Sequence, residues 1–361
     1  MSGKGRWLIR FLFLTAFFLL LILTRYPPPR FPTNFFFRFH PLVLVVSTLS
    51  SRKIIWILLP SLLFLVIIIG FKRNLFCEYV CPLGTILRTG TRLSPRKKKK
   101  ARFPSIQTPI FIFFLVLALF SLPLAGIVDP LSLIVRSSVS LYSLLFLMTL
   151  FLTNFFFPGI WCGKLCPVRG LYKLLQHPQR EFNSSRRRFL YALFSGLVVI
   201  PLIKGRRIPL LRPPGAKEEE EFISLCIRCG ECMKVCLSGT IHPVLLEGGW
   251  ENMFTPKIVP RKAPCELCFS CGKVCPTGSI RRDVQLKEVK IGTACIERNR
   301  CLVWDRNISC LICLEYCPLL AVYTDEKGRP IVDPNRCVGC GQCEYRCPVE
   351  GEAAIRVIPR M

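Results

Sequence analysis

Cysteines recur at short, nearly constant intervals through the C-terminal part of the chain, and no other feature constrains its fold as strongly. Sixteen of the 21 cysteines form four groups of four there. In three groups, two residues separate each of the first three cysteines and three residues precede the fourth; the third group instead has eight residues after its first cysteine. The groups are Cys226, Cys229, Cys232 and Cys236; Cys265, Cys268, Cys271 and Cys275; Cys301, Cys310, Cys313 and Cys317; and Cys337, Cys340, Cys343 and Cys347.

This spacing is typical of [4Fe–4S] ligands in bacterial ferredoxins, where three close cysteines hold one cluster and the fourth binds a neighbouring one. Zinc sites use pairs of cysteines that close one tetrahedron and have no use for a third and fourth at fixed offsets. Disulfides would leave cysteines two residues apart in need of distant partners. Attachment of a c-type haem needs a histidine after Cys-x-x-Cys, and no pair has one. We therefore expect these sixteen cysteines to bind four [4Fe–4S] clusters.

Two ways of sharing the fourth cysteines between motifs are open. Neighbouring pairing adds Cys275 to the first three cysteines of the first motif and Cys236 to those of the second. Nested pairing combines the first motif with the fourth and the second with the third. Polyferredoxin subunits of oxidoreductases, which this half of the chain resembles, often use the nested scheme, and the resemblance favours it. Cys295 lies outside the pattern, and we expect a buried thiol there rather than a ligand.

Charge and hydropathy divide the 361 residues into two unlike parts. The first 205 residues carry 27 basic and 3 acidic side chains, whereas the remaining residues carry 23 and 19. Together with an apolar content of 51%, this distribution is typical of the positive flanks of membrane spans. It argues against a nucleic-acid partner, because the excess positive charge is confined to the apolar part of the chain.

Five apolar stretches predict an α-helical transmembrane bundle of four to five spans in the first part. The heaviest basic loops, one of them with the run at 96–100, follow the second and fourth stretches. This places both loops and the N-terminus on the cytoplasmic side. The fifth stretch is shorter than the ~20 residues of an ideal span. The stretches are residues 7–23, 54–71, 109–128, 141–157 and 189–203.

A twin-arginine export signal is predicted at residues 185–190, because Ser-Arg-Arg-Arg-Phe-Leu precedes the fifth apolar stretch there. The alternative is the positive flank of a fifth span. No small-x-small cleavage site stands between Lys204 and Lys217, so we expect the stretch to remain as an anchor. The predicted division is a membrane domain at 1–184, the signal, anchor and linker at 185–221, and an α+β four-cluster ferredoxin domain at 222–361. Short strands are expected at 279–282, 321–323 and 354–358, with a loop or hairpin at 247–264.

A second cysteine pattern occurs twice in the apolar part, as Cys-x3-Cys-Pro at Cys77 and Cys81 and again at Cys162 and Cys166. Each copy follows an even-numbered apolar stretch, which indicates a duplicated two-span unit. Residues four apart lie on one face of a helix, so the two copies are able to present four thiolates to each other. A further Fe–S centre, a dithiol redox pair and structural thiols at helix ends are all open interpretations.

The polar residues outside the cysteine motifs predict no haem ligand, proton acceptor or catalytic residue. His40, His177 and His242 lie outside the predicted spans, so a bis-histidine haem in the membrane is not expected. Asp129 precedes Pro130, which favours a turn over a proton acceptor for quinol. The sequence shows no nucleophile–base arrangement and no nucleotide-binding loop, so no catalytic residue is assigned.

The first 180 or so residues resemble the NapH-type membrane component of a quinol dehydrogenase, through the four apolar stretches and the two Cys-x3-Cys-Pro loops. The remainder resembles the NapG/MauM family of periplasmic ferredoxins, through the twin-arginine start, the four motifs, the stretched motif at Cys301 and the tail from Cys337 to Arg356. The chain thus resembles a fusion of two subunits that are usually separate. It departs from NapH proteins because no ferredoxin motif stands between Cys166 and Arg186.

The resemblance implies a protein of the bacterial inner membrane, with its ferredoxin domain on the periplasmic side. Such a protein would pass electrons from the quinol pool to a periplasmic reductase or cytochrome, in nitrate reductase or methylamine-type systems. One alternative is an accessory factor for the assembly or maintenance of a respiratory metalloenzyme, because accessory proteins of cytochrome oxidases have similar loops and motifs. A membrane redox sensor is a further alternative, although the sequence shows no output domain.

Overall fold

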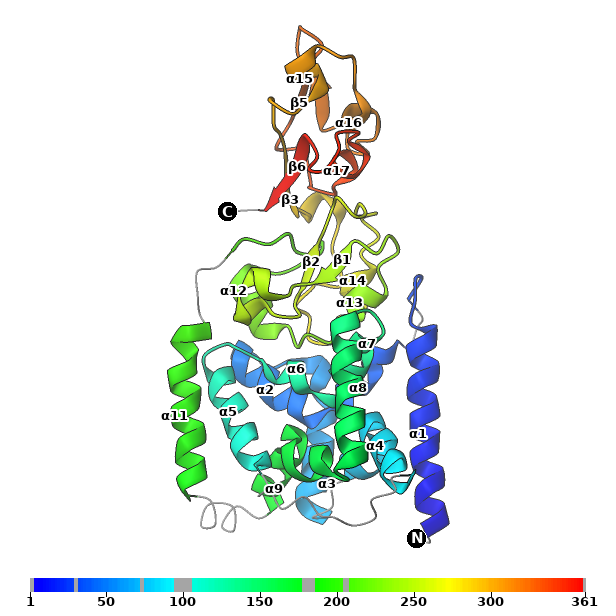
Figure 1. Ribbon diagram of the computed structural model, residues 1–361, viewed down its shortest axis with the longest axis vertical. Helices are drawn as coiled ribbons and strands as arrows, with labels where there is room; N and C mark the ends of the chain where they lie inside the picture. The colour runs from blue at the N-terminus through cyan, green and yellow to red at the C-terminus, as the bar shows by residue number, and fades with distance from the viewer. Residues whose placement is uncertain are drawn as a thin grey trace.

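The computed structural model describes residues 3–28, 32–71, 75–93, 106–176, 186–203 and 208–359. A helical domain occupies the lower half of Figure 1, and a narrower ferredoxin domain, built on the cysteine motifs, extends from it along the long axis. The N-terminus lies at the end of the helical domain that is farthest from the ferredoxin domain. The last helix of the helical domain, α11 (Arg186–Ile203), runs back towards the ferredoxin domain.

Most helices of the helical domain are short, and five of them begin at a proline. Proline suits the first position of a helix because its fixed φ is helical and its missing N–H would have no partner there. The elements before α11 are α1 (Gly3–Leu23), η1 (Thr33–Phe39), α2 (Pro41–Ser51), η2 (Trp56–Leu58), α3 (Pro60–Phe71), η3 (Phe76–Val80), α4 (Pro82–Leu93), α5 (Gln107–Leu119), α6 (Ala125–Val128), α7 (Pro130–Ser137), α8 (Leu141–Phe156), η4 (Trp161–Leu165) and α9 (Pro167–Gln176).

The predicted bundle of four to five spans is wrong for the part of the chain that the structure describes. Within α1, Gly5–Leu23 is the one helical segment there that is long and apolar enough to cross a membrane. The stretches predicted at 54–71, 109–128, 141–157 and 189–203 form apolar helices of 10–17 residues instead. Pro60 begins α3 in the middle of the second stretch, and α5 ends at Leu119, ahead of a turn that contains Pro123. Hydropathy did not reveal these breaks, because turn and helix residues are equally apolar there.

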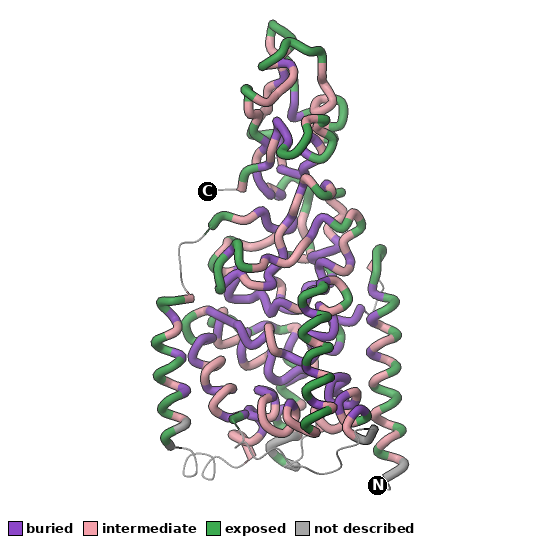
Figure 2. Tube along the Cα trace, in the orientation of Figure 1, coloured by how far each residue is buried: buried purple, intermediate pink, exposed green. Residues whose placement is uncertain are grey.

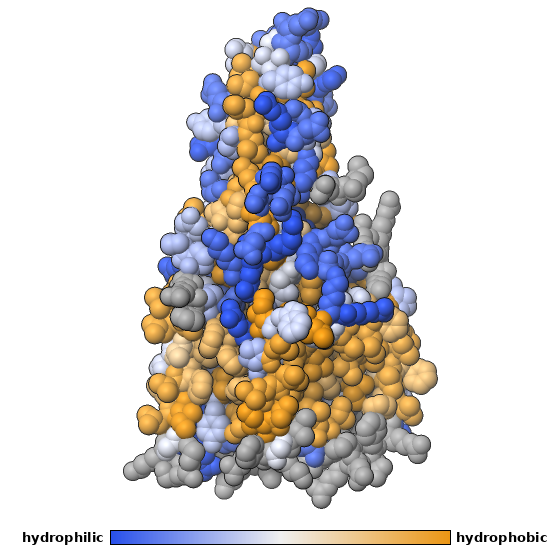
Figure 3. Space-filling model, turned by 180° about the vertical axis from the view of Figure 1, so that it is seen from behind, coloured by the Kyte–Doolittle hydropathy of each residue, from blue (hydrophilic) through white to orange (hydrophobic). Residues whose placement is uncertain are grey.

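Exposed apolar side chains form a broad belt around the helical domain, and polar side chains predominate above it (Figure 3). Figure 2 shows the contrast between the buried centre of the helical domain and its exposed outer helices. Apolar surface on this scale marks a site of contact with another molecule or with a membrane. Its members include Leu12 of α1, Leu63 of α3, Leu145 of α8 and Phe194 of α11.

The ferredoxin domain consists of short helices and three two-stranded antiparallel ladders, β1–β2, β3–β6 and β4–β5. Its elements are α12 (Glu219–Leu225), α13 (Glu231–Lys234), β1 (Ile241–Pro243), η5 (Leu246–Gly248), η6 (Trp250–Asn252), β2 (Pro256–Ile258), α14 (Ser270–Lys273), η7 (Leu286–Glu288), β3 (Gly292–Ile296), α15 (Leu302–Arg306), α16 (Ile312–Glu315), β4 (Val322–Thr324), β5 (Pro330–Val332), α17 (Gln342–Arg346) and β6 (Ile355–Pro359).

Two of the three predicted strands are present. Residues 321–323 and 354–358 correspond to β4 and β6, each displaced by one residue. Residues 279–282 form no strand, but Ile280 makes a single bridge to Ala216. The expected loop or hairpin at 247–264 contains β2, which returns to pair with β1. Cys295 lies on β3 and is exposed, so the expectation of a buried thiol is wrong.

Two buried arginines join the domains. Arg136 of α7 donates from Nη1 to the backbone oxygen of Arg228 at 3.1 Å, and Arg228 donates from its own Nη1 to the backbone oxygen of Pro123 at 2.7 Å. A Cβ atom at Gly126 would collide with the carbonyl group of Ile227. The loop of the first cysteine motif is therefore seated directly on α6 and α7.

Candidate metal centres

The cysteine motifs fold as loops that turn sharply around the second cysteine. In the first, second and fourth motifs, the residues on both sides of this cysteine have positive φ. Left-handed residues among right-handed ones turn successive N–H groups towards a common centre, which suits an anionic group. The pairs are Arg228 and Gly230, Leu267 and Phe269, and Gly339 and Gly341.

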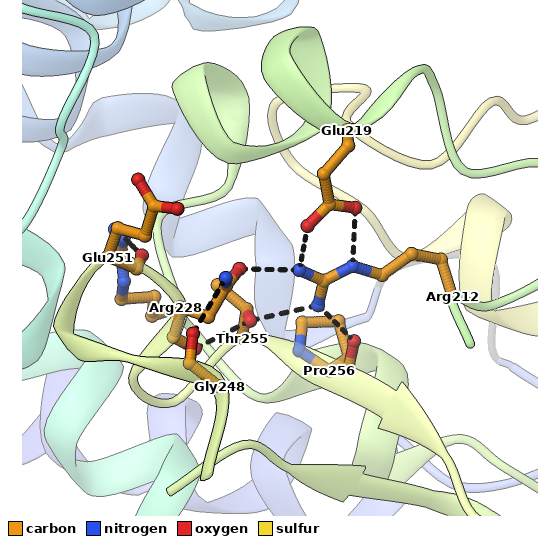
Figure 4. Close-up of polar contacts among 8 residues, drawn as sticks. Arg212, Glu219, Arg228, Gly248, Glu251, Thr255 and Pro256 are labelled. Carbon is orange, nitrogen blue, oxygen red and sulfur yellow. Dashed lines mark hydrogen bonds and ion pairs between the residues drawn. The ribbon is translucent and has the colours of Figure 1, made fainter. Parts of the chain in front are cut away.

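Polar contacts fix the first motif in the fold (Figure 4). Arg228, which lies between Cys226 and Cys229, donates to the backbone oxygens of Glu251 at 2.7 Å and Met253 at 3.0 Å. Nearby, Arg212 makes an ion pair with Glu219 and donates to Thr255 Oγ1 at 2.9 Å. The buried charges of these arginines are thus matched by carbonyl dipoles and a carboxylate, and the loop is held in one conformation.

The structure brings the third and fourth motifs together through exchanged cysteines. One cavity is lined by the first three cysteines of the third motif together with Cys347, the last of the fourth motif. A second cavity is lined by the first three cysteines of the fourth motif together with Cys317, the last of the third. Each cavity therefore gathers four thiols in the arrangement that a ferredoxin motif pair requires.

The first and second motifs exchange their last cysteines in the same way. Cys226, Cys229 and Cys232 each interact electrostatically with Cys275. Cys265 and Cys271 interact in turn with Cys268 and Cys236. The structure thus follows neighbouring pairing, and the preference for the nested scheme is wrong.

The four thiol sets follow one another along the long axis. The set completed by Cys275 is next to the set completed by Cys236, because Cys232 interacts with Cys271. That second set adjoins the set completed by Cys317, since the Cys265 N–H donates to the Cys340 carbonyl at 2.8 Å. The set completed by Cys347 comes last, next to α15 and α16 at the top of Figure 1. The sets form a row rather than a compact group.

Burial opposes the ionisation of these thiols. It raises the pKa of Cys265 and of Cys313 to about 12. Metal binding requires the thiolate, so bound iron must replace protons that the apolar surroundings favour. At Cys226 burial also raises the pKa, but the Arg228 guanidinium and a backbone N–H oppose it.

Replacing Gly339 tests whether the cysteine loops depend on close contacts between backbone segments. It has a φ of +77°, and a Cβ there would lie 2.6 Å from the backbone nitrogen of Gly292. We expect Gly339→Ala to lower the iron content and the midpoint of thermal unfolding. Gly328→Ala is the matched control, because Gly328 has a φ of +73° with nothing within 4 Å, so it incurs only the backbone cost of about 1–2 kcal/mol. Equal losses in the two variants would contradict a steric role.

The four remaining motif cysteines meet in the helical domain. Cys77, Cys81, Cys162 and Cys166 all line one cavity of about 540 Å³, which we call the cysteine chamber. The two copies of Cys-x3-Cys-Pro, 85 positions apart in the sequence, therefore face each other as their spacing allowed. Arg6, Arg88 and Arg169 also line the chamber and give it positive charge.

The two halves of the cysteine chamber have the same local structure. In each half, the first cysteine lies in a single π-helical turn, η3 or η4, and the second precedes a helix that begins with proline, α4 or α9. The Gly84 N–H donates to Cys81 Sγ at 3.4 Å, and the N–H groups of Val168 and Arg169 point at Cys166. N–H groups and the positive end of a helix dipole favour a thiolate. Burial raises the pKa of Cys81 and Cys166, and these N–H groups partly oppose it, as suits a sulfur that binds as a thiolate.

Two residues beside the cysteine chamber form a buried pair that sequence reasoning missed. His40 Nε2 lies 3.0 Å from Asp129 Oδ1, and both side chains are almost fully buried. Each residue is the N-cap of a proline-initiated helix, which is the sequence signal that points to them. Asp129 is therefore a buried cap rather than a turn outside a membrane. Burial raises its pKa, but His40 and the hydrogen bonds from Ser132 outweigh burial and hold the pKa below its usual value.

His242 lies on β1, and His177 and the residues 96–100 and 185 lie outside the described ranges. Among the described residues, no three His, Cys, Asp or Glu side chains lie close enough to hold a single metal ion.

A chain with exchanged Cys-x2-Cys-x2-Cys-x3-Cys motifs in a row is a polyferredoxin that binds Fe–S clusters. Comparison with known proteins agrees with this class. The family described as "4Fe-4S dicluster domain" matches residues 306–350, and the family described as "4Fe-4S binding domain" matches residues 53–101 and 139–184. The second match contains all four cysteines of the cysteine chamber.

Relatives of known name show which family of polyferredoxins the chain belongs to. The methylamine utilization ferredoxin-type protein MauM of Methylorubrum extorquens is 40% identical over 164 residues, which is 42% of this chain and 73% of the relative. MauM of Methylobacillus flagellatus is 33% identical over 52% of this chain and 86% of its own length. The ferredoxin-type protein NapG of Escherichia coli is 34% identical over 41% of this chain and 70% of its own length. The chain belongs to the MauM/NapG family of ferredoxin-type proteins. No solved structure matches it.

Proposed function

We propose that the chain carries electrons along a row of iron–sulfur centres from a membrane quinol pool to a periplasmic redox partner. The observation that carries the proposal is the succession of thiol sets along the long axis, each next to the following one. Electron-transfer rates fall steeply with distance, so a row of adjacent sites keeps every step short. Membership of a ferredoxin-type family supports electron transfer as the task.

The sixteen motif cysteines are the proposed ligands of four [4Fe–4S] clusters, which supply one-electron redox chemistry when bound. The protein's part is to hold the thiolates, exclude water and fix the spacing of the sites. The left-handed residues of the loops direct N–H groups towards the thiol sets. The ladder β3–β6 pairs the C-terminal strand with β3 beside the sets of the third and fourth motifs. The sets differ in burial, so their reduction potentials are expected to differ as well.

The cysteine chamber is the proposed fifth centre, at the membrane end of the row. Its four thiols, the two helix N-termini and the three arginines fit an anionic Fe–S group. The helix α7 connects it with the first ferredoxin site over about 12 Å, since eight residues rise 1.5 Å each. At one end Asp129 interacts electrostatically with Cys81 and Cys166, and at the other Arg136 interacts with Cys226 and Cys229.

Membrane attachment through α1 and the apolar belt completes the proposal. The N-termini of α1 and α11 both lie at the end of the helical domain that is remote from the ferredoxin domain (Figure 1). The twin-arginine match at residues 185–190 supports export of the ferredoxin domain to the outer side. The partner proposed there is a nitrate reductase or a methylamine-type system, in keeping with the names of the relatives.

Quinol-driven reduction of the anaerobically purified protein in detergent tests the proposal. We expect a ubiquinol or menaquinol analogue to reduce the centres within seconds, as followed by EPR, with about sixteen irons or more per chain. Dithionite, which reduces every accessible centre, is the control for cluster integrity. Centres that dithionite reduces and quinol does not would contradict the quinol-fed relay and favour an accessory role in metalloenzyme assembly.

A further inference from the structure

Tyr172 of α9 is buried beside the cysteine chamber with its hydroxyl group unused. Its side chain is fully buried, and its phenol oxygen has no hydrogen-bond partner among the described residues. It interacts electrostatically with Cys77, Cys81 and Cys166, which belong to both halves of the chamber. An unsatisfied buried hydroxyl is costly, so its presence requires an explanation.

The surroundings of Tyr172 indicate what it bonds to. Glu78, which lines the chamber, has its carboxylate paired with Arg10, and the buried Asp129 carboxylate is engaged by Ser132 and His40. The side chains that interact electrostatically with Tyr172 are cysteines, so the acceptor that the chamber offers is sulfur, either of a thiolate or of a group that the four cysteines hold. A phenol O–H is a good donor to such an anionic sulfur.

The two copies of the motif show that packing at this position does not require a hydroxyl group. Tyr172 lies five residues after Pro167, and the matching position after Pro82 is Leu87. Both side chains are buried, at 0% and 1% exposure. Leu87 therefore fills this position with an apolar side chain alone, whereas Tyr172 fills it and adds a hydroxyl group.

Resting on the proposed function, we infer that the Tyr172 hydroxyl donates a hydrogen bond to a sulfur of the iron–sulfur group held in the cysteine chamber and thereby raises its reduction potential. Hydrogen bonds to sulfur stabilise the more negative, reduced form and are a known control of such potentials. The proton stays on the phenol throughout. Tyr172 is a positioning and tuning residue, since the electron passes through the group held by the cysteines.

The test is a redox titration of Tyr172→Phe with iron counting. We expect unchanged iron content and a chamber centre whose reduction constant falls about tenfold, a shift of 59 mV for one electron. The four ferredoxin centres should keep their potentials. Tyr79→Phe is the matched control, because Tyr79 is a second tyrosine at the chamber, where it lines the cavity, but is partly exposed and lies under the Arg10 guanidinium.

A second replacement keeps the inference testable if the phenylalanine variant loses the centre. Tyr172→3,5-difluorotyrosine keeps the ring and makes the phenol a stronger donor, so the potential should rise instead of falling. A chamber centre with wild-type potential in the phenylalanine variant, or no rise in the fluorinated one, would overturn the inference. Absence of iron from the wild-type chamber would instead refute the proposed fifth centre, which separates the two failures.

Discussion

In a chain that carries Cys77→Ser and Cys162→Ser together, we expect the iron content to fall by about four atoms and quinol-driven reduction of the ferredoxin centres to be lost. Dithionite should still reduce those centres, because their ligands lie in another domain. The reason is positional, because the cysteine chamber lies in the helical domain and the first ferredoxin set is reached from it along α7. Iron analysis, EPR and stopped-flow reduction measure the three effects.

Cys295→Ser is the matched control for that result. Cys295 is an exposed cysteine on β3 outside all five thiol sets, so iron content and reduction rate should not change. Unchanged iron in the double variant would contradict a metal centre in the chamber. A dithiol pair in the chamber would give a different result. The double variant would lose quinol reduction without losing iron, and two thiols of the wild type would become unavailable to alkylation on oxidation.

Fe–S binding in the ferredoxin half could be predicted from the sequence because its chemistry is local. Two or three residues between thiols fix which cysteines share a loop, so the spacing led directly to exchanged motifs, and the family comparison supports Fe–S binding. Pairing between motifs depends on how loops far apart in the sequence pack. The contact of Cys265 with Cys340, for example, has no local signal.

The helical half was predicted less well because hydropathy shows neither where an apolar helix ends nor where a turn interrupts an apolar stretch. Residues 109–128 are apolar throughout, yet a turn separates α5 from α6 and allows α6 to meet the Ile227 carbonyl of the first motif. The duplicated Cys-x3-Cys-Pro pattern did predict that four thiols could face each other. His40 was missed because its partner Asp129 lies 89 positions away, and Tyr172 because it lies beside cysteines of both motif copies, the more distant of them 95 positions away at Cys77.

Asp129→Asn is expected to be the most destabilising single exchange in the helical domain. The carboxylate faces His40 Nε2 at 3.0 Å, accepts hydrogen bonds from Ser132 and interacts with the buried Arg136. Removing a buried charge on which another buried charge depends typically costs about 3–5 kcal/mol, and here the Arg136 guanidinium stays buried without the carboxylate. We expect a large fall in the midpoint of thermal unfolding at pH 7, measured by circular dichroism in detergent.

The pH dependence of that loss identifies its cause. The pKa of folded Asp129 is held below its usual value, so its charge stabilises the fold above the unfolded pKa of about 3.9 and ceases to do so as the pH falls through the lower folded value. The difference between wild type and Asp129→Asn should therefore be full at pH 7 and shrink below about pH 4. Asp305→Asn is the control, because that carboxylate is half-exposed beside Arg306 and contributes little. If the difference in unfolding midpoint between wild type and Asp129→Asn stayed the same at low pH, Asp129 would act through packing. The N-cap of α7 would then not depend on the charge of the carboxylate.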